Sequence, residues 1–435
     1  MMRNLVEFAS AILLGALLGS IMVQVGPGLP ISLAISFALI LVLFHVCQNI
    51  EGEAPLVAKI FLVSAVGRVL LAIFLHNVIR DPATLAGDDS AYEYYGKLLA
   101  RAWSENSSLL LARANSRTQG DILQNAYIYW NAGLFYVFGQ EVSLLPKCIN
   151  AVFGALTPIY FYRICWRLST PLAARYVLYI SVLAPSMVLW SVLNLRDSFA
   201  ILAITSSIYY TILLKESFQV GDMIKLGLSM VLVTALRTYM FAILGLALAL
   251  SFIGFRKGHE FRDLFVGLLV ALGLGYLFRG LGVGESSALN DASFEQLHQM
   301  RIGLASGGSA YAVGSDVSSP GKALLFLPVG VVYFLFAPFP WQISGLRQIL
   351  AFPEVLLFYW LFPSMVKGVR RMIKDDLIRW LPVLLPAFLV TVTYSLVEGN
   401  VGTAFRHKAQ VLGLYFVVAA YELAARQRER GGPGA

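Results

Sequence analysis

The chain has 435 residues, of which 58% are hydrophobic and only 13% are charged. Because a soluble domain carries about 25% charged residues, this composition excludes an ordinary soluble enzyme and indicates a polytopic membrane protein. The formal net charge of +8 lies in short Lys and Arg clusters between apolar runs, a pattern that orients membrane helices and does not call for nucleic acid as a partner.

Long, continuous apolar runs predict an all-α protein with a single transmembrane domain over residues 1–435. Each crossing needs about 20 apolar residues, so the runs predict about twelve transmembrane helices. Further helices at residues 126–138 and 323–339 are predicted to be interfacial or re-entrant. The predicted crossings are residues 5–23, 31–49, 56–79, 144–165, 176–193, 199–214, 226–236, 239–252, 264–278, 346–366, 380–396 and 411–425. The first run lacks an obvious small-residue cleavage site, so we interpret it as a retained helix.

Two long polar intervals, residues 80–125 and 279–322, interrupt the apolar runs. The basic clusters assigned to the cytoplasm are Arg163, Arg167 and Arg175, and Lys367, Arg370, Arg371 and Lys374. This assignment places both polar intervals on the outer side of the cytoplasmic (inner) membrane and both termini in the cytoplasm. Cys47, Cys148 and Cys165 show no paired spacing, which predicts free, buried thiols.

The first outer loop carries the most distinctive polar group, the acidic pair Asp88 and Asp89, followed by Tyr92. Residues 92–103 repeat aromatic and aliphatic side chains at helical spacing, which predicts an amphipathic helix along the membrane surface. Two adjacent carboxylates at a membrane surface suit a general base. They also suit a divalent cation, Mg²⁺ or Mn²⁺, at Asp88 or Asp89.

Several cationic side chains fall on the same predicted side. Arg196, Arg237 and Arg406 lie in short turns and Arg301 lies in the second outer loop. Guanidinium groups suit phosphate or pyrophosphate, but each of these arginines also suits a lipid headgroup. His407 is a candidate base or metal ligand, with an interfacial packing role as the alternative. Arg68, in the middle of an apolar run, is a functional candidate or a residue with a backbone carbonyl partner.

These motifs resemble the GT-C superfamily of membrane glycosyltransferases. The resemblance rests on Asp88, Asp89 and Tyr92, on the aromatic stretch 127–139, and on two later stretches, 184–191 and 195–198. It covers about residues 56–214. Residues 336–341 and 400–407 look like proteins of bacterial polysaccharide gene clusters. The acidic loop here follows the third predicted crossing, whereas in the superfamily it usually follows the first.

The resemblance implies an inverting transferase that moves a sugar from a polyprenyl phosphate to a glycan or lipid acceptor, in surface polysaccharide biosynthesis. Asp88 and Asp89 would then be catalytic. The residues that would bind substrate or phosphate are Tyr92, Arg196, Arg237, Arg301, Arg406 and His407. Two alternatives stay open, a polymerase or ligase of polyprenyl-pyrophosphate-linked repeats and a lipid-linked glycan transporter or flippase.

Overall fold

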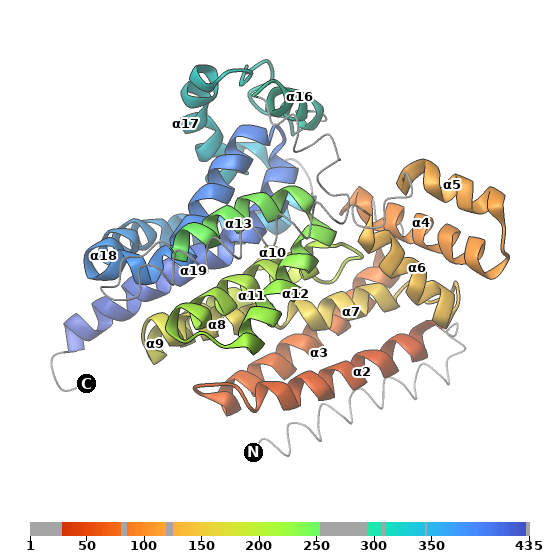
Figure 1. Ribbon diagram of the computed structural model, residues 1–435, viewed down its shortest axis with the longest axis horizontal. Helices are drawn as coiled ribbons and strands as arrows, with labels where there is room; N and C mark the ends of the chain where they lie inside the picture. Colours follow the sequence, from red (N-terminus) through yellow and green to blue (C-terminus); the bar gives the residue numbers. More distant parts are fainter. Residues whose placement is uncertain are drawn as a thin grey trace. The chain divides into compact units, whose positions relative to one another are not determined.

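The computed structural model describes residues 28–79, 85–118, 125–252, 294–305, 309–343 and 346–431 (Figure 1). The predicted crossings at residues 5–23 and 264–278, and the first part of the second outer loop, lie outside the described residues. The described residues are almost entirely helical and contain no β-strand, only an isolated bridge between Ala310 and Asn400. The all-α prediction is therefore confirmed.

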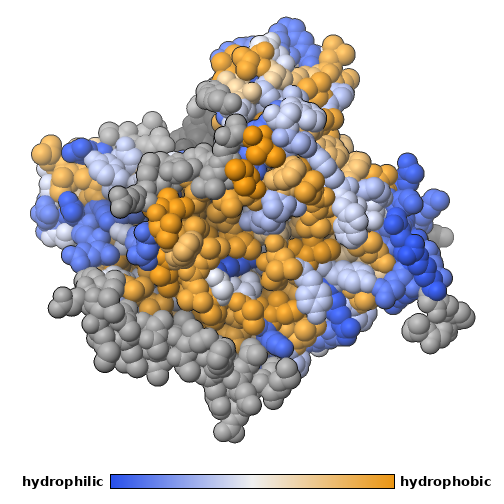
Figure 2. All heavy atoms as spheres, turned by 180° about the vertical axis from the view of Figure 1, so that it is seen from behind, coloured by the Kyte–Doolittle hydropathy of each residue, from blue (hydrophilic) through white to orange (hydrophobic). Residues whose placement is uncertain are grey.

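Six of the described helices are long and apolar enough to cross a membrane. These spans are Gly28–Cys47, Ala54–Val78, Leu145–Leu168, Asp197–Glu216, Gln348–Val397 and Val401–Arg430, of which Leu145–Leu168 contains a turn between Gly154 and Thr157. Large apolar side chains such as Leu183, Leu325 and Phe388 are exposed on the described helices, and hydrophobic residues cover much of the face shown in Figure 2. These features fit a multi-pass membrane protein. The number of crossings, the membrane and the side on which each terminus lies stay predictions.

The described helices form two compact units, each considered by itself. The first unit comprises the described parts of Met1–Arg163, Leu178–Ala203 and Val231–Thr238. In it, α2 (Gly28–Cys47), α3 (Ala54–Val78) and α7 (Leu145–Gly154) pack against one another, and α4 (Gly87–Ser104) packs against both α5 (Ser108–Thr118) and α6 (Ala126–Phe138). The described part of the polar interval 80–125, predicted as the first outer loop, is therefore largely helical.

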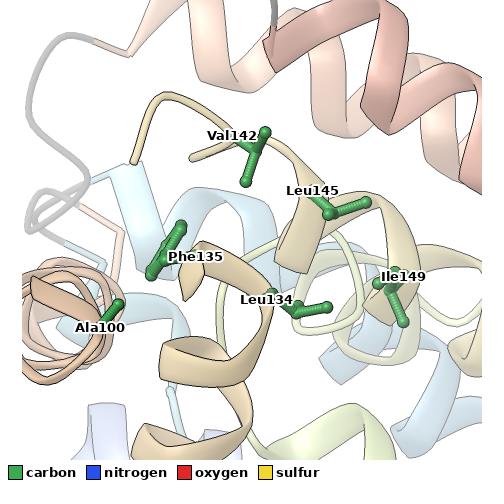
Figure 3. Close-up of a cluster of buried hydrophobic side chains, with 6 residues drawn as sticks. All are labelled: Ala100, Leu134, Phe135, Val142, Leu145 and Ile149. Atoms are coloured by element: carbon green, nitrogen blue, oxygen red, sulfur yellow. The ribbon is translucent and has the colours of Figure 1, made fainter. Parts of the chain in front are cut away.

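A cluster of buried apolar side chains joins α4, α6 and α7 in the first unit (Figure 3). Phe135 of α6 lies among Ala100 of α4 and Leu145 and Ile149 of α7. Gly96 lets α4 approach α6 closely, since a Cβ at this position would lie 2.7 Å from the Cβ of Asn131. The helix that carries the acidic pair is thus fixed to the apolar part of the unit.

The second unit comprises the described parts of Ile164–Val177, Ile204–Met230 and Tyr239–Ala435. Its helices α17 (Pro320–Phe336), α18 (Leu346–Val397) and α19 (Val401–Gly431) pack together, and α16 (Phe294–Leu304) packs against α18. A short 3₁₀ helix, η2 (Pro340–Gln342), follows α17. Asp376 interrupts α18 with non-helical backbone angles, at the point between the two predicted crossings 346–366 and 380–396.

The remaining described helices lie between α7 and α16 in the sequence. They are α8 (Thr157–Leu168), α9 (Pro171–Leu183), α10 (Pro185–Leu189), α11 (Asp197–Glu216), α12 (Val220–Leu236) and α13 (Thr238–Phe252). The helix predicted at residues 126–138 has these same bounds as α6, and Gly139 ends it with a φ of 96° that suits glycine. The three cysteines are free and buried, as predicted.

Three predicted segments differ from the structure. A turn divides the predicted crossing 144–165 into α7, which ends at Gly154, and α8, which begins at Thr157. The predicted crossing 176–193 is not one helix, because α9 ends at Leu183 and α10 runs only from Pro185 to Leu189. Pro185 has no N–H to continue the helix. The predicted outer turn 398–407 is mostly helical, since α19 begins at Val401. Arg406 and His407 therefore lie within a helix and not in a turn.

Close packing of α18 on α19 gives a first testable prediction. A Cβ at Gly368 would lie 2.5 Å from the carbonyl oxygen of Val418, so Gly368→Ala should lower the free energy of unfolding by about 1–3 kcal/mol. Thermal unfolding of the purified protein in detergent measures this change. Gly227→Ala is the matched control, because nothing lies within 4 Å of that position. An unchanged midpoint for Gly368→Ala would contradict the close approach of the two helices.

Candidate functional site

The acidic pair lies in the first turn of α4, where the two carboxylates have different surroundings. Asp88 is exposed, whereas Asp89 is fully buried. The first turn of a helix favours negative charge because its N–H groups have no intrahelical acceptors. The structure therefore separates the pair into an accessible carboxylate and a buried one.

Asp89 is held by groups from two distant parts of the chain. The Nζ of Lys147, in α7, lies 3.3 Å from Oδ1 of Asp89, and both side chains are almost fully buried. The backbone N–H of Asn194 donates to Oδ2 at 3.0 Å. These contacts fix the start of α4 against α7 and against the segment after α10.

A buried polar cluster continues from Asn194 to Tyr127 and Asn150. The hydroxyl of Tyr127 donates to Oδ1 of Asn194 at 2.8 Å and accepts from Nδ2 of Asn150 at 2.7 Å. Nδ2 of Asn150 also lies 2.8 Å from the carbonyl oxygens of both Leu193 and Leu195. Asn150 thus supplies the hydrogen bonds that this non-helical segment lacks. Burial raises the pKa of Tyr127 well above its ordinary value, so its hydroxyl remains a donor.

Three more predicted site residues lie near this cluster. The ring of Tyr92 packs edge-on against Tyr127, with centroids 4.8 Å apart. Arg196 is half-buried and follows the segment that Asn150 holds. Arg237 is buried, and its Nη2 lies 2.5 Å from Oδ1 of the fully buried Asp197. The first unit therefore brings Asp88, Asp89, Tyr92, Arg196 and Arg237 to one region, although the charge of Arg237 is already balanced by Asp197.

The other predicted cations belong to the second unit. Arg301 is buried and donates to the carbonyl oxygen of Glu398 and, at 3.3 Å each, to those of Tyr311 and Ala312. Its guanidinium also lies over the ring of Phe326, 4.1 Å from the centroid. Burial lowers the pKa of Arg301. This arginine ties three backbone positions together and has little surface left for a ligand.

His407 and Arg406 lie near the start of α19. Arg406 is half-buried. Nδ1 of His407 is hydrogen-bonded to a carboxylate oxygen of Glu398, which is fully buried. The ring of His407 stacks on Tyr394, with centroids 4.8 Å apart. The histidine is therefore oriented by a carboxylate and by an aromatic ring.

Arg68 has a backbone carbonyl partner, which was one of the two alternatives for this residue in the sequence analysis. Its Nη1 donates to the carbonyl oxygen of Met187 at 2.6 Å and to Oγ of Ser191 at 2.7 Å. Arg68 also lines a mostly apolar pocket of about 380 Å³ between α3 and the α9–α10 break, beside Val63 and Leu183. Arg68 thus satisfies a carbonyl near a broken helix.

Sequence reasoning missed the side chains that hold these groups. Lys147 and Asn150 lie inside an apolar run, and the only signal for them is that a lysine and an asparagine there need polar partners. Tyr127 falls in the predicted aromatic stretch 127–139 and Tyr394 in the predicted crossing 380–396, and neither residue was singled out as a site residue. Their roles depend on contacts between segments that are far apart in the sequence.

The acidic pair is also the predicted site for a divalent cation. Within the described ranges, no three His, Cys, Asp or Glu side chains gather as a metal-binding group. Asp89 is already paired with Lys147, which leaves Asp88 as the accessible carboxylate of the pair. This donor set does not fit a metal cage built by the protein.

Comparison of the chain with family models, with curated proteins and with solved structures finds no match.

The buried pair of Asp89 and Lys147 gives a second prediction. Asp89→Asn leaves the charge of Lys147 buried without a counter-charge, which should destabilise the protein by about 3–5 kcal/mol. Adding Lys147→Gln removes that charge, so the double variant should recover part of the loss in thermal unfolding. Asp222→Asn is the matched control because its partner Lys225 is exposed, and it should cost less than about 1 kcal/mol. Equal unfolding midpoints for Asp89→Asn and the wild type would refute the buried pair.

Proposed function

We propose that this protein is an inverting membrane glycosyltransferase. It would transfer a sugar from a polyprenyl phosphate to a glycan or lipid acceptor at the outer face of the cytoplasmic membrane, in surface polysaccharide biosynthesis. The observation that carries the proposal is the acidic pair in the first turn of α4. Asp89 is anchored by Lys147 and Asn194, while Asp88 next to it stays exposed.

The proposed chemistry uses Asp88 as the base. The acceptor hydroxyl attacks the anomeric carbon while its proton passes to Asp88, and the bond from that carbon to the phosphate oxygen breaks. A positioned base of this kind contributes roughly 10²- to 10⁴-fold to the rate. The departing phosphate needs cations more than a proton, and Arg196 is the candidate within the first unit. The donor set at Asp88 and Asp89 fits no metal cage, so no step is assigned to a cation there.

A lipid-linked glycan transporter is the second candidate, and a specific observation favours it. Besides Arg68, the apolar spans bury Glu354 and Lys408 completely, and the two are close enough to interact electrostatically. Ionisable groups inside membrane spans often mark transport pathways. A transporter would move the labelled lipid across a bilayer without forming a glycosidic bond.

The third prediction tests the transferase directly. Purified protein in lipid vesicles is given labelled polyprenyl-phosphate hexoses and a surface-glycan extract, and labelled glycan is measured. Asp88→Asn should lower the transfer rate on the order of a hundredfold or more without lowering the unfolding midpoint, because Asp88 is exposed. Glu105→Gln, which changes an exposed carboxylate at the other end of α4, should transfer normally.

The outcomes separate the candidate functions. Normal transfer by the Asp88→Asn variant would exclude the acidic pair as the source of the catalytic base. If transfer requires the arginines but does not require Asp88, the polymerase or ligase is favoured. Movement of labelled lipid across the bilayer with no transfer by the wild type would favour the transporter.

A further inference from the structure

The pocket that Arg68 lines follows one face of α3 in the first unit, and we refer to it as the α3 groove. Its α3 side runs from Lys59 through Val63 and Gly67 to Arg68, a stretch of helix about 14 Å long. These positions are about four residues apart and therefore share one helix face. The end of α9 and α10 form the other side, beside Leu183. The volume of about 380 Å³ is that of a ligand pocket.

The walls of the α3 groove suit a hydrocarbon chain. Leu183 is 76% exposed and Val63 is 59% exposed, so both present apolar surface at the opening. A Cβ at Gly67 would meet no atom within 4 Å, so the middle of the groove is open. Between Lys59 and Arg68 the side chains that line the pocket carry no charge. In a multi-pass membrane protein the chain available to cover such a surface is a lipid tail.

A lipid tail alone does not make the groove selective. Lipid tails are about as apolar as leucine, so inside a bilayer little hydrophobic free energy distinguishes one tail from another. Any preference among lipids has to come from the polar end of the ligand. The charge at the end of the groove therefore decides which lipid binds.

Lys59 supplies that charge. It is partly buried and lies five residues after Ala54, the first residue of α3. A lysine near the end of a membrane-crossing helix extends its ammonium group to the headgroup layer. Within the described part of the chain Lys59 forms no ion pair or hydrogen bond. A phosphate is the complementary group, and basic pockets between membrane helices bind anionic headgroups in this way.

Arg68 closes the deep end of the groove. Its Nε donates to Oγ of Ser64 at 3.1 Å, and its Nη1 donates to the carbonyl oxygen of Met187 and to Oγ of Ser191. These protein groups already use donors of the guanidinium. A phosphate at this depth would also lie about 14 Å along α3 from Lys59, where burying its charge is costly. The phosphate therefore belongs at Lys59 and the tail at Arg68.

The charged end of the groove is far from the acidic pair. His76, near the other end of α3, is close enough to Asp89 to interact with it electrostatically. Lys59 precedes His76 by 17 residues on the same helix, a distance of about 25 Å. A sugar phosphate held at Lys59 would keep its anomeric carbon far from Asp88. The ligand of the groove is therefore a different lipid from the proposed donor.

We propose that the α3 groove binds an anionic phospholipid of the membrane, with its phosphate at Lys59 and one acyl chain along α3 as far as Arg68. In the predicted topology α3 begins on the cytoplasmic side, so this lipid comes from the cytoplasmic leaflet. The acyl chain contacts both α3 and the α9–α10 break. A ligand that binds only the folded state stabilises it by mass action. The inference goes beyond the proposed function and does not depend on it.

The fourth prediction measures charge-selective binding by photo-crosslinking. The protein is placed in phosphatidylcholine vesicles that contain a trace of phosphatidylglycerol or phosphatidylcholine with a photoreactive acyl chain. Peptide mapping then compares adducts on residues 59–68 with those on residues 384–392 of α18, where Phe388 is exposed. Residues 59–68 should prefer phosphatidylglycerol about fivefold, since one lysine near the surface contributes about 1 kcal/mol.

Matched variants separate the charge from the groove itself. Lys59→Gln should abolish the preference and Lys59→Arg should keep it. Lys367→Gln removes an exposed lysine of α18 and should leave the preference unchanged. Gly67→Leu fills the groove and should lower the adducts of both lipids on residues 59–68 several-fold. Gly227→Leu, at another open position, should not lower them.

A second readout needs no photoreactive lipid. Phosphatidylglycerol added in detergent should raise the thermal unfolding midpoint of the wild type more than that of Lys59→Gln. The proposal is overturned if the two midpoints rise equally, if the wild type shows no preference for the anionic lipid, or if Lys59→Gln keeps that preference. Displacement of the photoreactive lipid by polyprenyl phosphate but not by unlabelled phosphatidylglycerol would also overturn it, because the occupant would then be the donor type of lipid.

Discussion

The structure depends on how charged side chains are accommodated among apolar helices. Removing an unpaired charge from water costs several kcal/mol, so each buried charge needs a partner. The first unit pairs Asp89 with Lys147 and Asp197 with Arg237. The second unit bonds Glu398 to His407. In the first unit the partners are distant in the sequence and join separate helices, so a change at one of them would leave a buried charge uncompensated. Glu398 and His407 are only nine residues apart and are joined across one turn.

Broken helices impose a second requirement, because backbone groups released inside an apolar layer also need partners. The chain between α9 and α11 shows how this is met. Arg68 binds the carbonyl of Met187, and Asn150 binds those of Leu193 and Leu195. Both side chains lie on continuous neighbouring helices. An irregular segment can therefore run through the unit and present its polar groups to Asp89, which a straight helix could not do.

Sequence patterns predicted the helices well where one apolar run makes one helix. The bounds of α6 and the positions of α2 and α3 follow from run length and from Gly139. The break at Pro185 was missed because the run stays apolar on both sides of it. The candidate site was likewise predicted only in part. The sequence alone identifies Asp88 and Asp89 as candidates. That Asp89 is buried and Asp88 exposed depends on Lys147 and Asn194, whose positions the local sequence does not predict. The joining of Glu398 to His407 across a turn was likewise invisible in spacing alone.

Both units use a buried carboxylate in the same physical way. Asp89 and Glu398 are fully buried, and hydrogen bonds or an ion pair hold each carboxylate in place. Their value lies in orientation. Asp89 fixes the helix turn on which Asp88 is exposed, and Glu398 is hydrogen-bonded to Nδ1 of the His407 ring. A reactive group must be accessible and also rigid, and these requirements conflict for a single exposed side chain at a membrane surface. Dividing them between a buried carboxylate and its neighbour resolves the conflict. It follows that changes at Asp89 and Glu398 should act mainly through geometry and stability, whereas changes at Asp88 should act on the proposed transfer.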